Sequence, residues 1–363
     1  MTTAAVLDDG SDELLVTDIE VDQPGPREVS VRSLATGLCH SDLHYIDGVL
    51  NRPRPVLLGH EAVGIVDAVG PGVESVAVGD HVVTCLVVGC GTCPRCEQGE
   101  PFVCANPNAT RRARGAPPRH AMHDGRPIGT MANIGSFSAR MLVDERALVK
   151  VPASMPPTLA AIVGCAVVTG LGSVFNVARV RPTDTVAIIG CGGVGLNVVQ
   201  GARIAGAAKV IAVDVSSAKL DLARKLGATD TVDASQTDAV EAVRALTGEG
   251  VDHAFEVIGR AETARQAFDM ASPGRRAYVV GVFPDDAELA LPTLSLRRGK
   301  SLVGVFMGAT RPRVDIPRYI ELWERGLLDL ESMVSDVIAL DQVNEGFHAL
   351  QRGEVARAVI SFD

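Results

Sequence analysis

Four cysteines lie close together in the stretch CGTCPRCEQGEPFVC, at Cys90, Cys93, Cys96 and Cys104. Their spacing lets one compact loop of about residues 89–105 direct four thiolates at a single centre, which predicts tetrahedral zinc with every position filled by protein. Such a site is structural, because it leaves no position for a substrate. An iron–sulfur cluster is the alternative interpretation, and visible absorbance would reveal it.

A second set of metal-binding residues is spread along the chain. Cys39 lies in GLCHSDLH, His60 in LGHEAVG and Cys165 in IVGCAVVTG. Each alone has an ordinary structural explanation, since buried cysteines and histidines often only pack in a core. Together, two sulfurs and one nitrogen form the ligand set of a catalytic zinc with one open position. The remaining thiols, Cys85 and Cys191, are expected to pack.

A glycine-rich turn follows in VAIIGCGGVG, with Gly190, Gly192 and Gly195 between an apolar strand and a helix. This context is the one that dinucleotide binding requires: a tight turn, room for the pyrophosphate and close helix packing, with phosphate at the helix N-terminus. Asp214 ends the next strand, 24 residues after Gly190. A carboxylate there hydrogen-bonds the adenosine ribose and repels a 2′-phosphate, so NAD is expected rather than NADP. A helix-capping role is the alternative for Asp214.

The elements that must position these residues change character along the chain. Residues 1 to about 160 contain short apolar runs separated by Gly and Pro, which predicts a mostly β region. From about Ala166, apolar strands alternate with helical stretches, which predicts an α/β region around a parallel sheet that reaches six strands by about Phe306. The tail contains amphipathic helices and a closing strand.

The composition is that of an ordinary globular protein long enough for two domains: 363 residues, 47% hydrophobic and 21% charged. A formal net charge of -10 disfavours nucleic acid and anionic lipid as partners. The N-terminus lacks a signal-peptide pattern and no apolar run is long enough to cross a bilayer, so we expect a cytoplasmic protein without membrane contact. In that compartment, clustered cysteines indicate metal binding or catalysis rather than disulfides.

One segment, residues 106–129, carries five arginines and four prolines and few large apolar residues. We expect it to be an exposed loop, because charge runs usually serve solvation. Recognition of an anionic substrate is the alternative function for its arginines.

Taken together, these motifs resemble the zinc-dependent, medium-chain alcohol dehydrogenases, close to the liver-type alcohol dehydrogenases and the thiol-dependent formaldehyde dehydrogenases. GLCHSD, GHEAVGIV, GVESVAVGDHV, the four-cysteine stretch, GCGGVGLNVVQGA, FEVIGR and NEGFHALQRGE occur in family order. The resemblance implies a GroES-like catalytic domain over residues 1–166, a doubly wound Rossmann domain over 167–305 and a C-terminal segment, 306–363, that returns to the catalytic domain. The arginine-rich segment is the chief departure from the family pattern, and it leaves the substrate open.

Residue by residue, the resemblance implies a catalytic zinc on Cys39, His60 and Cys165, with Glu61 able to approach the metal. Asp42 would orient the His60 imidazole, and Ser41 and His44 would begin and end the proton path. Contacts to NAD are implied for the following residues: His40, Thr169, Gly190, Gly192, Gly193, Val194, Gly195, Asp214, Lys219 and Arg357. An apolar substrate pocket is implied for Leu50, Leu86 and Phe306.

The function implied is the reversible, NAD-linked oxidation of a primary alcohol, with aliphatic, aryl and terpenoid alcohols as candidates. One catalytic and one structural zinc per subunit and a homodimer are implied as well. The proton would leave through Ser41, the nicotinamide ribose and His44, and hydride would pass to the nicotinamide. Two alternatives stay open: oxidation of a thiol adduct of formaldehyde, and a non-catalytic relative that binds NAD or zinc.

Overall fold

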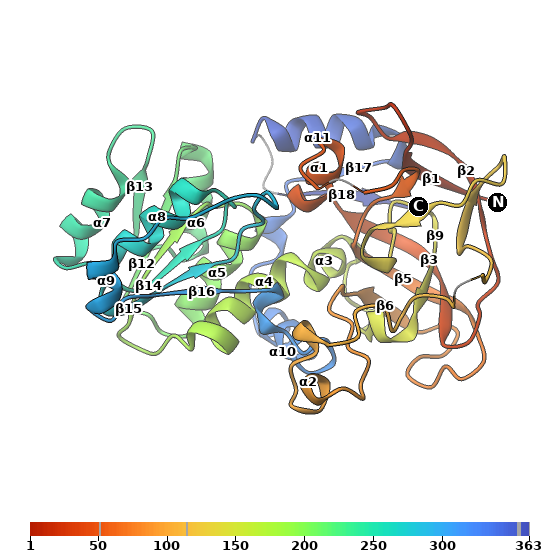
Figure 1. Ribbon diagram of the computed structural model, residues 1–363, viewed down its shortest axis with the longest axis horizontal. Helices are drawn as coiled ribbons and strands as arrows, with labels where there is room; N and C mark the ends of the chain where they lie inside the picture. Colours follow the sequence, from red (N-terminus) through yellow and green to blue (C-terminus); the bar gives the residue numbers. More distant parts are fainter. Residues whose placement is uncertain (51, 114, 354–356, 363) are drawn as a thin grey trace. The chain divides into compact units, whose positions relative to one another are not determined.

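The computed structural model describes residues 1–50, 52–113, 115–353 and 357–362, which form two compact units (Figure 1). The first unit comprises Met1–Cys165, Arg311–Pro317 and Val334–Asp363, and the second comprises Ala166–Thr310 and Arg318–Met333. Each unit has its own core of buried apolar side chains, as expected for a chain of this length.

The first unit is mainly β-structure, because its short apolar runs are interrupted by turns before a helix can form. Its strands are β1 (Thr2–Leu7), β2 (Leu15–Val21), β3 (Glu28–Gly37), β4 (Val56–Leu57), β5 (Glu61–Val69), β6 (His81–Thr84), β7 (His120–Met122), β8 (Gly129–Thr130), β9 (Arg140–Asp144), β10 (Leu148–Lys150), β17 (Asp336–Ile338) and β18 (Ala358–Ser361). One sheet has the order β7-β2-β1-β4-β8. The other has the order β10-β6-β5-β3-β18-β17, with β9 paired to β3.

The second of these sheets fixes where the chemistry-bearing residues lie. Strands β3 and β5 are antiparallel, and Gly37 at the end of β3 is opposite Glu61 at the start of β5. The residues just after β3 therefore meet the residues just before β5. Strand β18 pairs with β3 on its other side, with Val359 opposite Gly37, so the C-terminal strand closes on the same corner.

Helices of the first unit are short: α1 (His40–Ile46), α2 (Pro94–Glu97), α3 (Pro157–Ala161) and α11 (Val343–Gln351). Helix α1 starts directly after β3, and α2 lies in the four-cysteine stretch. A buried apolar cluster packs α1 and α11 against the first sheet through side chains such as Leu43, Leu57 and Phe347.

The second unit contains a six-stranded parallel sheet of order β13-β12-β11-β14-β15-β16. Its strands are β11 (Thr185–Ile189), β12 (Lys209–Asp214), β13 (Asp230–Asp233), β14 (Val251–Glu256), β15 (Ala271–Val279) and β16 (Ser301–Gly304). Its helices are α4 (Ala166–Gly172), α5 (Gly193–Ile204), α6 (Ser217–Leu226), α7 (Ala239–Thr247), α8 (Ala261–Met270) and α9 (Thr293–Arg297), and α10 (Pro312–Glu324) ends in this unit.

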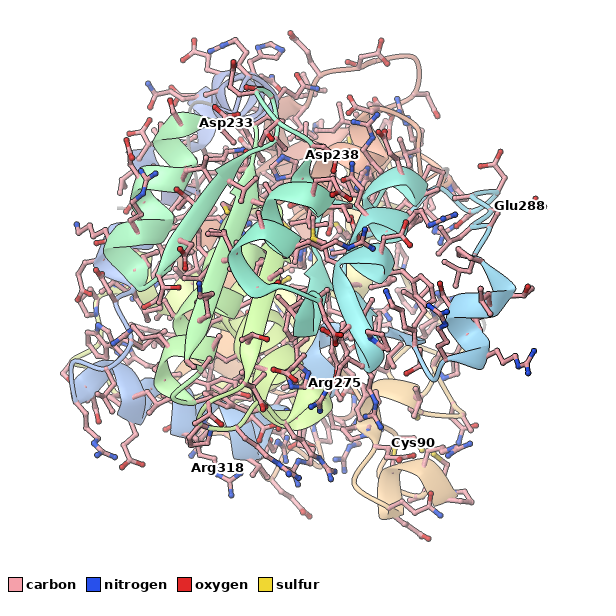
Figure 2. The ribbon with its side chains drawn as sticks, turned by 90° about the vertical axis from the view of Figure 1, so that its left-hand side faces the viewer. Cys90, Asp233, Asp238, Arg275, Glu288 and Arg318 are labelled. Carbon is pink, nitrogen blue, oxygen red and sulfur yellow. The ribbon has the colours of Figure 1, made fainter. Side chains whose placement is uncertain are left out.

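Because the strand order reverses at β11 and β14, right-handed crossovers place α5 and α6 on one face of the sheet and α7 and α8 on the other. The expected doubly wound fold and its six strands are confirmed, although the sequence pattern did not single out β13. In Figure 2 the carboxyl end of β13 is marked by Asp233 and the start of α7 by Asp238, while Arg275 marks the opposite end of the sheet.

Among the described residues, no single helix is both long and apolar enough to cross a membrane. Two consecutive helical segments, Pro157–Gly164 and Ala166–Ala178, reach the length and apolar composition of a membrane span only when taken together, and they are bent by 53° relative to each other.

Candidate active site and metal centres

The four thiols of the α2 region converge on one point. Each offers a sulfur within 4.8 Å of the others, and Cys90–Cys96 and Cys93–Cys104 sulfur distances are 4.0 and 3.9 Å. Zinc–sulfur bonds of about 2.3 Å in a tetrahedron place sulfurs about 3.8 Å apart, so the set fits one zinc ion. In an iron–sulfur cluster the four thiolates are divided over two or four irons and lie farther apart than around a single ion, which this close spacing does not suit.

The second metal-binding set is brought together by the sheet. Cys39 precedes α1, His60 precedes β5, and the antiparallel β3–β5 register joins them. Cys165 follows Gly164, where a side-chain carbon would lie 1.8 Å from the Thr84 carbonyl oxygen. The Thr84 hydroxyl donates a hydrogen bond to the His60 carbonyl oxygen at 3.0 Å, so β6 aligns both ligands. The ligand atoms of Cys39, His60, Glu61 and Cys165 all lie within 4.8 Å of one another.

These residues fit a zinc ion on evidence from their own surroundings. All four are buried, and both ring nitrogens of His60 and both carboxylate oxygens of Glu61 have no hydrogen-bond partner. Buried polar atoms are almost always satisfied in folded proteins, so such a concentration calls for a missing ligand. Two sulfurs, one imidazole and a carboxylate are donors that zinc accepts.

Asp42 lies behind this set and holds its backbone. Its carboxylate accepts hydrogen bonds from Cys39 N at 3.1 Å and Gly59 N at 2.9 Å. Its Oδ1 is also 3.4 Å from His60 Nδ1, an ion-pair distance without a hydrogen bond. Burial alone would lower the pKa of His60, but the Asp42 carboxylate and Cys39 outweigh it and raise that pKa in the metal-free protein. Nε2 is then the nitrogen left for a metal.

A buried cation completes the cluster. Arg357 NH1 donates a hydrogen bond to the Leu38 carbonyl oxygen at 2.7 Å and lies 3.2 Å from Glu61 Oε1. Burial raises the pKa of Glu61 to about 8 without metal, although Arg357 acts against that rise. The family resemblance implies that Arg357 contacts the pyrophosphate of the dinucleotide, and that role stays a prediction. Its position beside Glu61 was not foreseen.

Helix α1 carries the two residues expected to move the proton. Ser41 Oγ lies 3.7 Å from Cys39 Sγ, so its hydroxyl borders the metal set. His44 is three residues further on, which places it on the same face of the helix. Both side chains are partly exposed, which a path to solvent requires.

The glycine loop after β11 has the geometry that the motif predicts. Gly190 has a φ of +100°, where residues with side chains are strained. A side-chain carbon on Gly195 would lie 1.8 Å from the Gly190 carbonyl oxygen, whereas one on Gly192 would meet no atom within 4 Å. The first and third glycines are thus required by the fold, and the second keeps open space before the N-terminus of α5, where Gly193 and Val194 begin the helix.

Asp214 ends β12 beside this loop and braces it. Its carboxylate accepts hydrogen bonds from Cys191 N at 2.7 Å and Ser216 N at 3.0 Å. These bonds orient the carboxylate at the carboxyl edge of the sheet, where parallel α/β sheets bind ligands. Burial raises the pKa of the Cys191 thiol, so Cys191 is a neutral packed side chain, as expected.

Two apolar residues at this edge were missed by the sequence reasoning. Val215, after β12, is 67% exposed, and Ile258, after β14, is 43% exposed. The Ile258 side chain lies over Gly190. Exposed apolar side chains at the carboxyl ends of two parallel strands suit a flat aromatic ring such as adenine. The sequence feature that could have predicted this surface is Val215, an apolar residue directly after Asp214.

The other expected contact residues are distributed over both units. His40, Leu50 and Leu86 belong to the first unit, and Thr169, Lys219 and Phe306 to the second. Thr169 is buried and donates a hydrogen bond to Met307 Sδ at 3.4 Å. Phe306 is 55% exposed, and Leu86 packs beside a buried apolar cluster. Their roles toward cofactor and substrate stay predictions.

The arginine-rich segment differs from the expectation of a solvated loop. Although most of its residues are exposed, it contributes β7 and β8 to a sheet. Glu28, which is buried, accepts from Arg112 at 2.6 Å and Arg119 at 2.7 Å, and Arg126 pairs with Asp8 at 2.9 Å. The two arginines hold the pKa of Glu28 at about 2 even though burial opposes them. These three arginines therefore anchor the segment.

Comparison with known proteins gives a consistent family assignment. Residues 25–153 match the family model of the alcohol dehydrogenase GroES-like domain, and residues 193–325 match that of the zinc-binding dehydrogenase. The S-(hydroxymethyl)glutathione dehydrogenase of Synechocystis is 35% identical over 99% of both chains.

Solved structures agree over the whole chain. An alcohol dehydrogenase zinc-binding domain protein from Burkholderia ambifaria has a TM-score of 0.94 and 33% identity, covering 100% of this chain and 99% of that one. Benzyl alcohol dehydrogenase from Acinetobacter calcoaceticus has a TM-score of 0.91 and 31% identity, with the same coverage.

Proposed function

Since this chain belongs to the zinc-dependent medium-chain alcohol dehydrogenases, a family of oxidoreductases, we propose that it catalyses the reversible NAD-linked oxidation of a primary alcohol to an aldehyde. One observation carries this proposal: Cys39, His60 and Cys165 offer ligand atoms within 4.8 Å of one another in a buried pocket of unsatisfied polar atoms. A chain that only packed these residues would leave no such atoms unpaired.

In the proposed site, Cys39, His60 and Cys165 hold the catalytic zinc and Glu61 stands beside it. Zinc at this position would supply a Lewis acid that lowers the pKa of a neighbouring hydroxyl group, as it does for water in other enzymes. Asp42 keeps His60 in place through its hydrogen bonds from the backbone amides of Cys39 and Gly59. Arg357 offsets the negative charge of Glu61 and the two thiolates.

Ser41 accepts the proton of the alcohol hydroxyl, and His44 passes it on to solvent. The order follows from their places on α1, with Ser41 at the metal set and His44 one turn further along. Proton transfer through positioned groups of this kind contributes roughly 10²–10⁴-fold to rate.

We place NAD at the carboxyl edge of the parallel sheet, where it would accept the hydride. The backbone amides at the start of α5 bind its pyrophosphate, Asp214 binds the adenosine ribose, and Val215 and Ile258 cover the adenine. His40, Thr169, Lys219 and Arg357 are the further contacts proposed from the family pattern. The negative charge of the Asp214 carboxylate favours NAD over NADP, because a 2′-phosphate would be repelled.

For the substrate, we propose a primary alcohol with a sizeable hydrocarbon or aryl group, received by Leu50, Leu86 and Phe306. Benzyl alcohol dehydrogenase is among the similar structures. The curated relative that acts on S-(hydroxymethyl)glutathione favours a second candidate, the thiol adduct of formaldehyde. The anchored arginines weigh against it, since Arg112, Arg119 and Arg126 are paired with carboxylates of this chain.

We also propose a homodimer formed through the edge of the parallel sheet. Strand β16 is the last of that sheet, and Leu294 and Leu296 on the preceding α9 are 57% and 44% exposed. An edge strand beside exposed apolar residues is suited to pairing with a second copy. A cytoplasmic location is proposed because all eight cysteines are free.

The deciding experiment is a spectrophotometric screen for NADH formation from aliphatic, aryl and terpenoid alcohols and from formaldehyde, with and without low-molecular-weight thiols. Turnover of a primary alcohol without thiol supports the main proposal. Formaldehyde oxidation only with thiol replaces it with the second candidate, and no NADH from any member of the panel favours a non-catalytic relative.

A further inference from the structure

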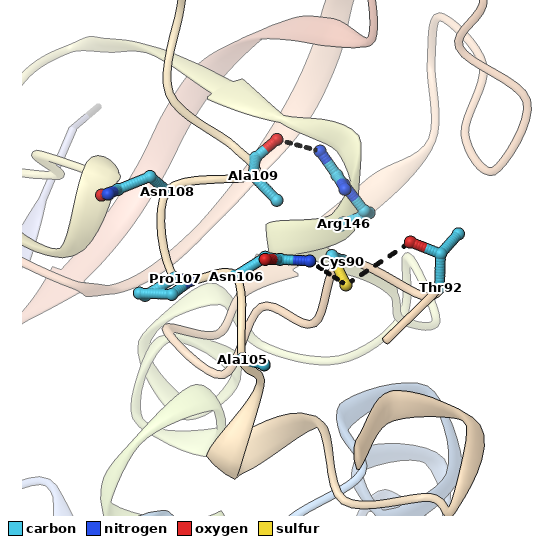
Figure 3. Close-up of a pocket in the computed structure, with 8 residues that line it drawn as sticks. All are labelled: Cys90, Thr92, Ala105, Asn106, Pro107, Asn108, Ala109 and Arg146. Atoms are coloured by element: carbon cyan, nitrogen blue, oxygen red, sulfur yellow. Dashed lines mark hydrogen bonds between the residues drawn. The ribbon is translucent and has the colours of Figure 1, made fainter. Parts of the chain in front are cut away.

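A hollow of about 520 Å³ lies beside the four-thiol lobe (Figure 3). Among the four sulfur ligands, it is Cys90 that lines this hollow. The other lining residues come from the lobe itself, from the segment that follows it and from one arginine: Thr92, Ala105, Asn106, Pro107, Asn108, Ala109 and Arg146. A small molecule that enters the hollow therefore reaches Cys90.

The sulfur atoms of the lobe accept hydrogen bonds but are not equally accessible. Cys90 Sγ accepts hydrogen bonds from Asn106 Nδ2 at 3.5 Å and Thr92 Oγ1 at 3.7 Å, both on exposed residues. Cys104 Sγ accepts from the backbone amides of Cys90 and Asn106, at 3.2 and 3.3 Å. Backbone N–H groups of Thr92 and Cys93 also donate to Cys90 Sγ. The sulfurs therefore differ in access: Cys93 is only 6% exposed, whereas Cys90 borders the hollow.

Arg146 also lines the hollow, and its side chain is fixed by two contacts. Its guanidinium pairs with Asp144 at 2.8 Å and donates to the Ala109 carbonyl oxygen at 2.8 Å. In Figure 3, the dashed line between Arg146 and Ala109 marks this bond, and the other two dashed lines mark the hydrogen bonds to the Cys90 sulfur. The hollow beside Cys90 is thus bordered by an arginine whose position is fixed by an ion pair and a hydrogen bond.

We propose that Cys90 is the site at which small peroxides oxidise the four-thiol lobe and expel its metal. The inference rests on the closed zinc site proposed above and goes beyond the dehydrogenase activity. It assigns an oxidant-sensing role to a part of the chain separate from Cys39, His60 and Cys165, whose cluster is fully buried.

The chemistry balances with the peroxide as the sole oxidant. The Cys90 thiolate attacks the O–O bond of the peroxide, forming a sulfenic acid and releasing hydroxide. The Cys96 thiolate, 4.0 Å away, then attacks the sulfenic sulfur, forming a disulfide and releasing a second hydroxide. Two thiolates lose two electrons, one peroxide becomes two waters after two protons are taken up, and the metal loses two ligands.

The test uses the intact zinc-loaded protein treated with hydrogen peroxide. Released zinc is followed with a chromogenic indicator, and the cysteines are mapped by alkylation, trypsin digestion and mass spectrometry. Cleavage after Arg95 leaves Cys90 and Cys93 on one peptide and Cys96 and Cys104 on the next, so the disulfide appears as a linked pair of peptides whose fragment ions identify the joined cysteines. We expect this pair to appear at the rate of zinc release, with Cys39, Cys85 and Cys165 unmodified.

A variant that restricts access through the hollow tests whether peroxide reaches Cys90 by this route. Ala109→Phe places an aromatic ring in the hollow and narrows it, without removing the backbone carbonyl that Arg146 contacts. We expect zinc release to slow by about tenfold, because oxidation follows exposure of the thiolate. Ala116→Phe, at an exposed position outside the hollow, serves as the matched control and should leave the rate unchanged.

An unchanged rate in Ala109→Phe overturns the proposal, as does first oxidation at Cys39 or Cys165. A first disulfide between Cys93 and Cys104 overturns it too. These readouts are independent of NADH formation, so failure of the proposed dehydrogenase reaction would leave the result at Cys90 interpretable.

Discussion

The two metal centres are built in opposite ways. The ligands of the four-thiol lobe lie within one stretch, Cys90–Cys104, and three of the four are partly exposed. Those of the other centre come from a loop before α1, a loop before β5 and a turn after α3, and all are buried. The first is a local loop that a metal closes, and the second is a pocket that the sheet register assembles.

This difference teaches what each centre depends on. A lobe of short turns with almost no apolar core has little to hold it besides its metal, so metal binding there is folding free energy. The buried centre is framed by β3, β5, β6 and β18, whose ladders join segments far apart in the chain. Its framework therefore depends on strand pairing, and its metal is expected to serve the reaction more than the fold.

The largest effect is expected from His60→Ala. Removing this ligand should abolish alcohol oxidation and release about one of two zinc ions while the four-thiol lobe keeps the other. Zinc content by atomic absorption and NADH formation measure both. His123→Ala, an exposed histidine, should retain both metals and turnover. Full activity of His60→Ala would refute the ligand assignment.

Ser41→Ala should slow turnover by roughly 10²–10⁴-fold, because the proton loses its first acceptor. Ser41→Thr keeps a hydroxyl at the same position and should largely restore the rate. Steady-state kcat with zinc content unchanged is the measurement, and equal rates for the Ala and Thr variants would remove Ser41 from the proton path.

Cys104→Ser should act on the lobe alone. We expect loss of one zinc and a fall in the free energy of unfolding of at least about 2 kcal/mol, with turnover per folded molecule retained. Urea unfolding and zinc content measure these. Cys85→Ala is the control, since Cys85 is buried outside both metal sets and burial raises its pKa to about 12. Loss of catalysis with stability intact would contradict the division of roles.

Asp214→Ala should reduce the preference for NAD over NADP by about tenfold, the equivalent of about 1.4 kcal/mol for a lost charge-assisted hydrogen bond. The ratio of kcat/KM for the two cofactors measures it. Asp233→Ala is the matched control, because Asp233 ends β13 directly opposite Asp214 in the sheet register. An unchanged ratio in Asp214→Ala counts against the ribose role.

A third region, the arginine-rich segment 106–129, is stabilised by ion pairs, whereas we expect the four-thiol lobe to be stabilised by its metal. The pKa of Glu28 is lowered to about 2, against about 4.3 in an unfolded chain. Its stabilisation is therefore present above about pH 4.3 and is lost as pH falls toward 2. Glu28→Gln should remove roughly 1 kcal/mol of stability near neutral pH and less below about pH 3.

Urea unfolding between pH 7 and pH 3 measures this loss, and Asp124→Asn, an exposed partner of Arg126, is the control. Metal chelation should not alter the Glu28 contribution. A difference between parent and Glu28→Gln that does not shrink on acidification would show that the arginines do not hold the segment through Glu28.

Much of the fold could be predicted because its signals are local. The period of apolar residues separates the β-rich first part from the alternating second part, and the glycine spacing follows from one turn and one close helix contact at Gly190 and Gly195. Strand β13 escaped notice since Asp230–Asp233 is short and mostly polar. The arginine segment is mostly exposed as predicted, but its ion pairs could not be predicted because the partners Glu28 and Asp8 lie far away in sequence.

The sequence by itself determined which side chains can do chemistry: four thiols at loop spacing, a glycine turn before a helix, and a carboxylate after the next strand. Only the tertiary structure decided which distant residues meet. The register of β3 with β5 brings Cys39 to His60, the close approach of Gly164 to Thr84 adds Cys165, and β18 places Arg357 against Glu61. Such contacts depend on the packing of segments far apart in the chain, and no local pattern encodes them.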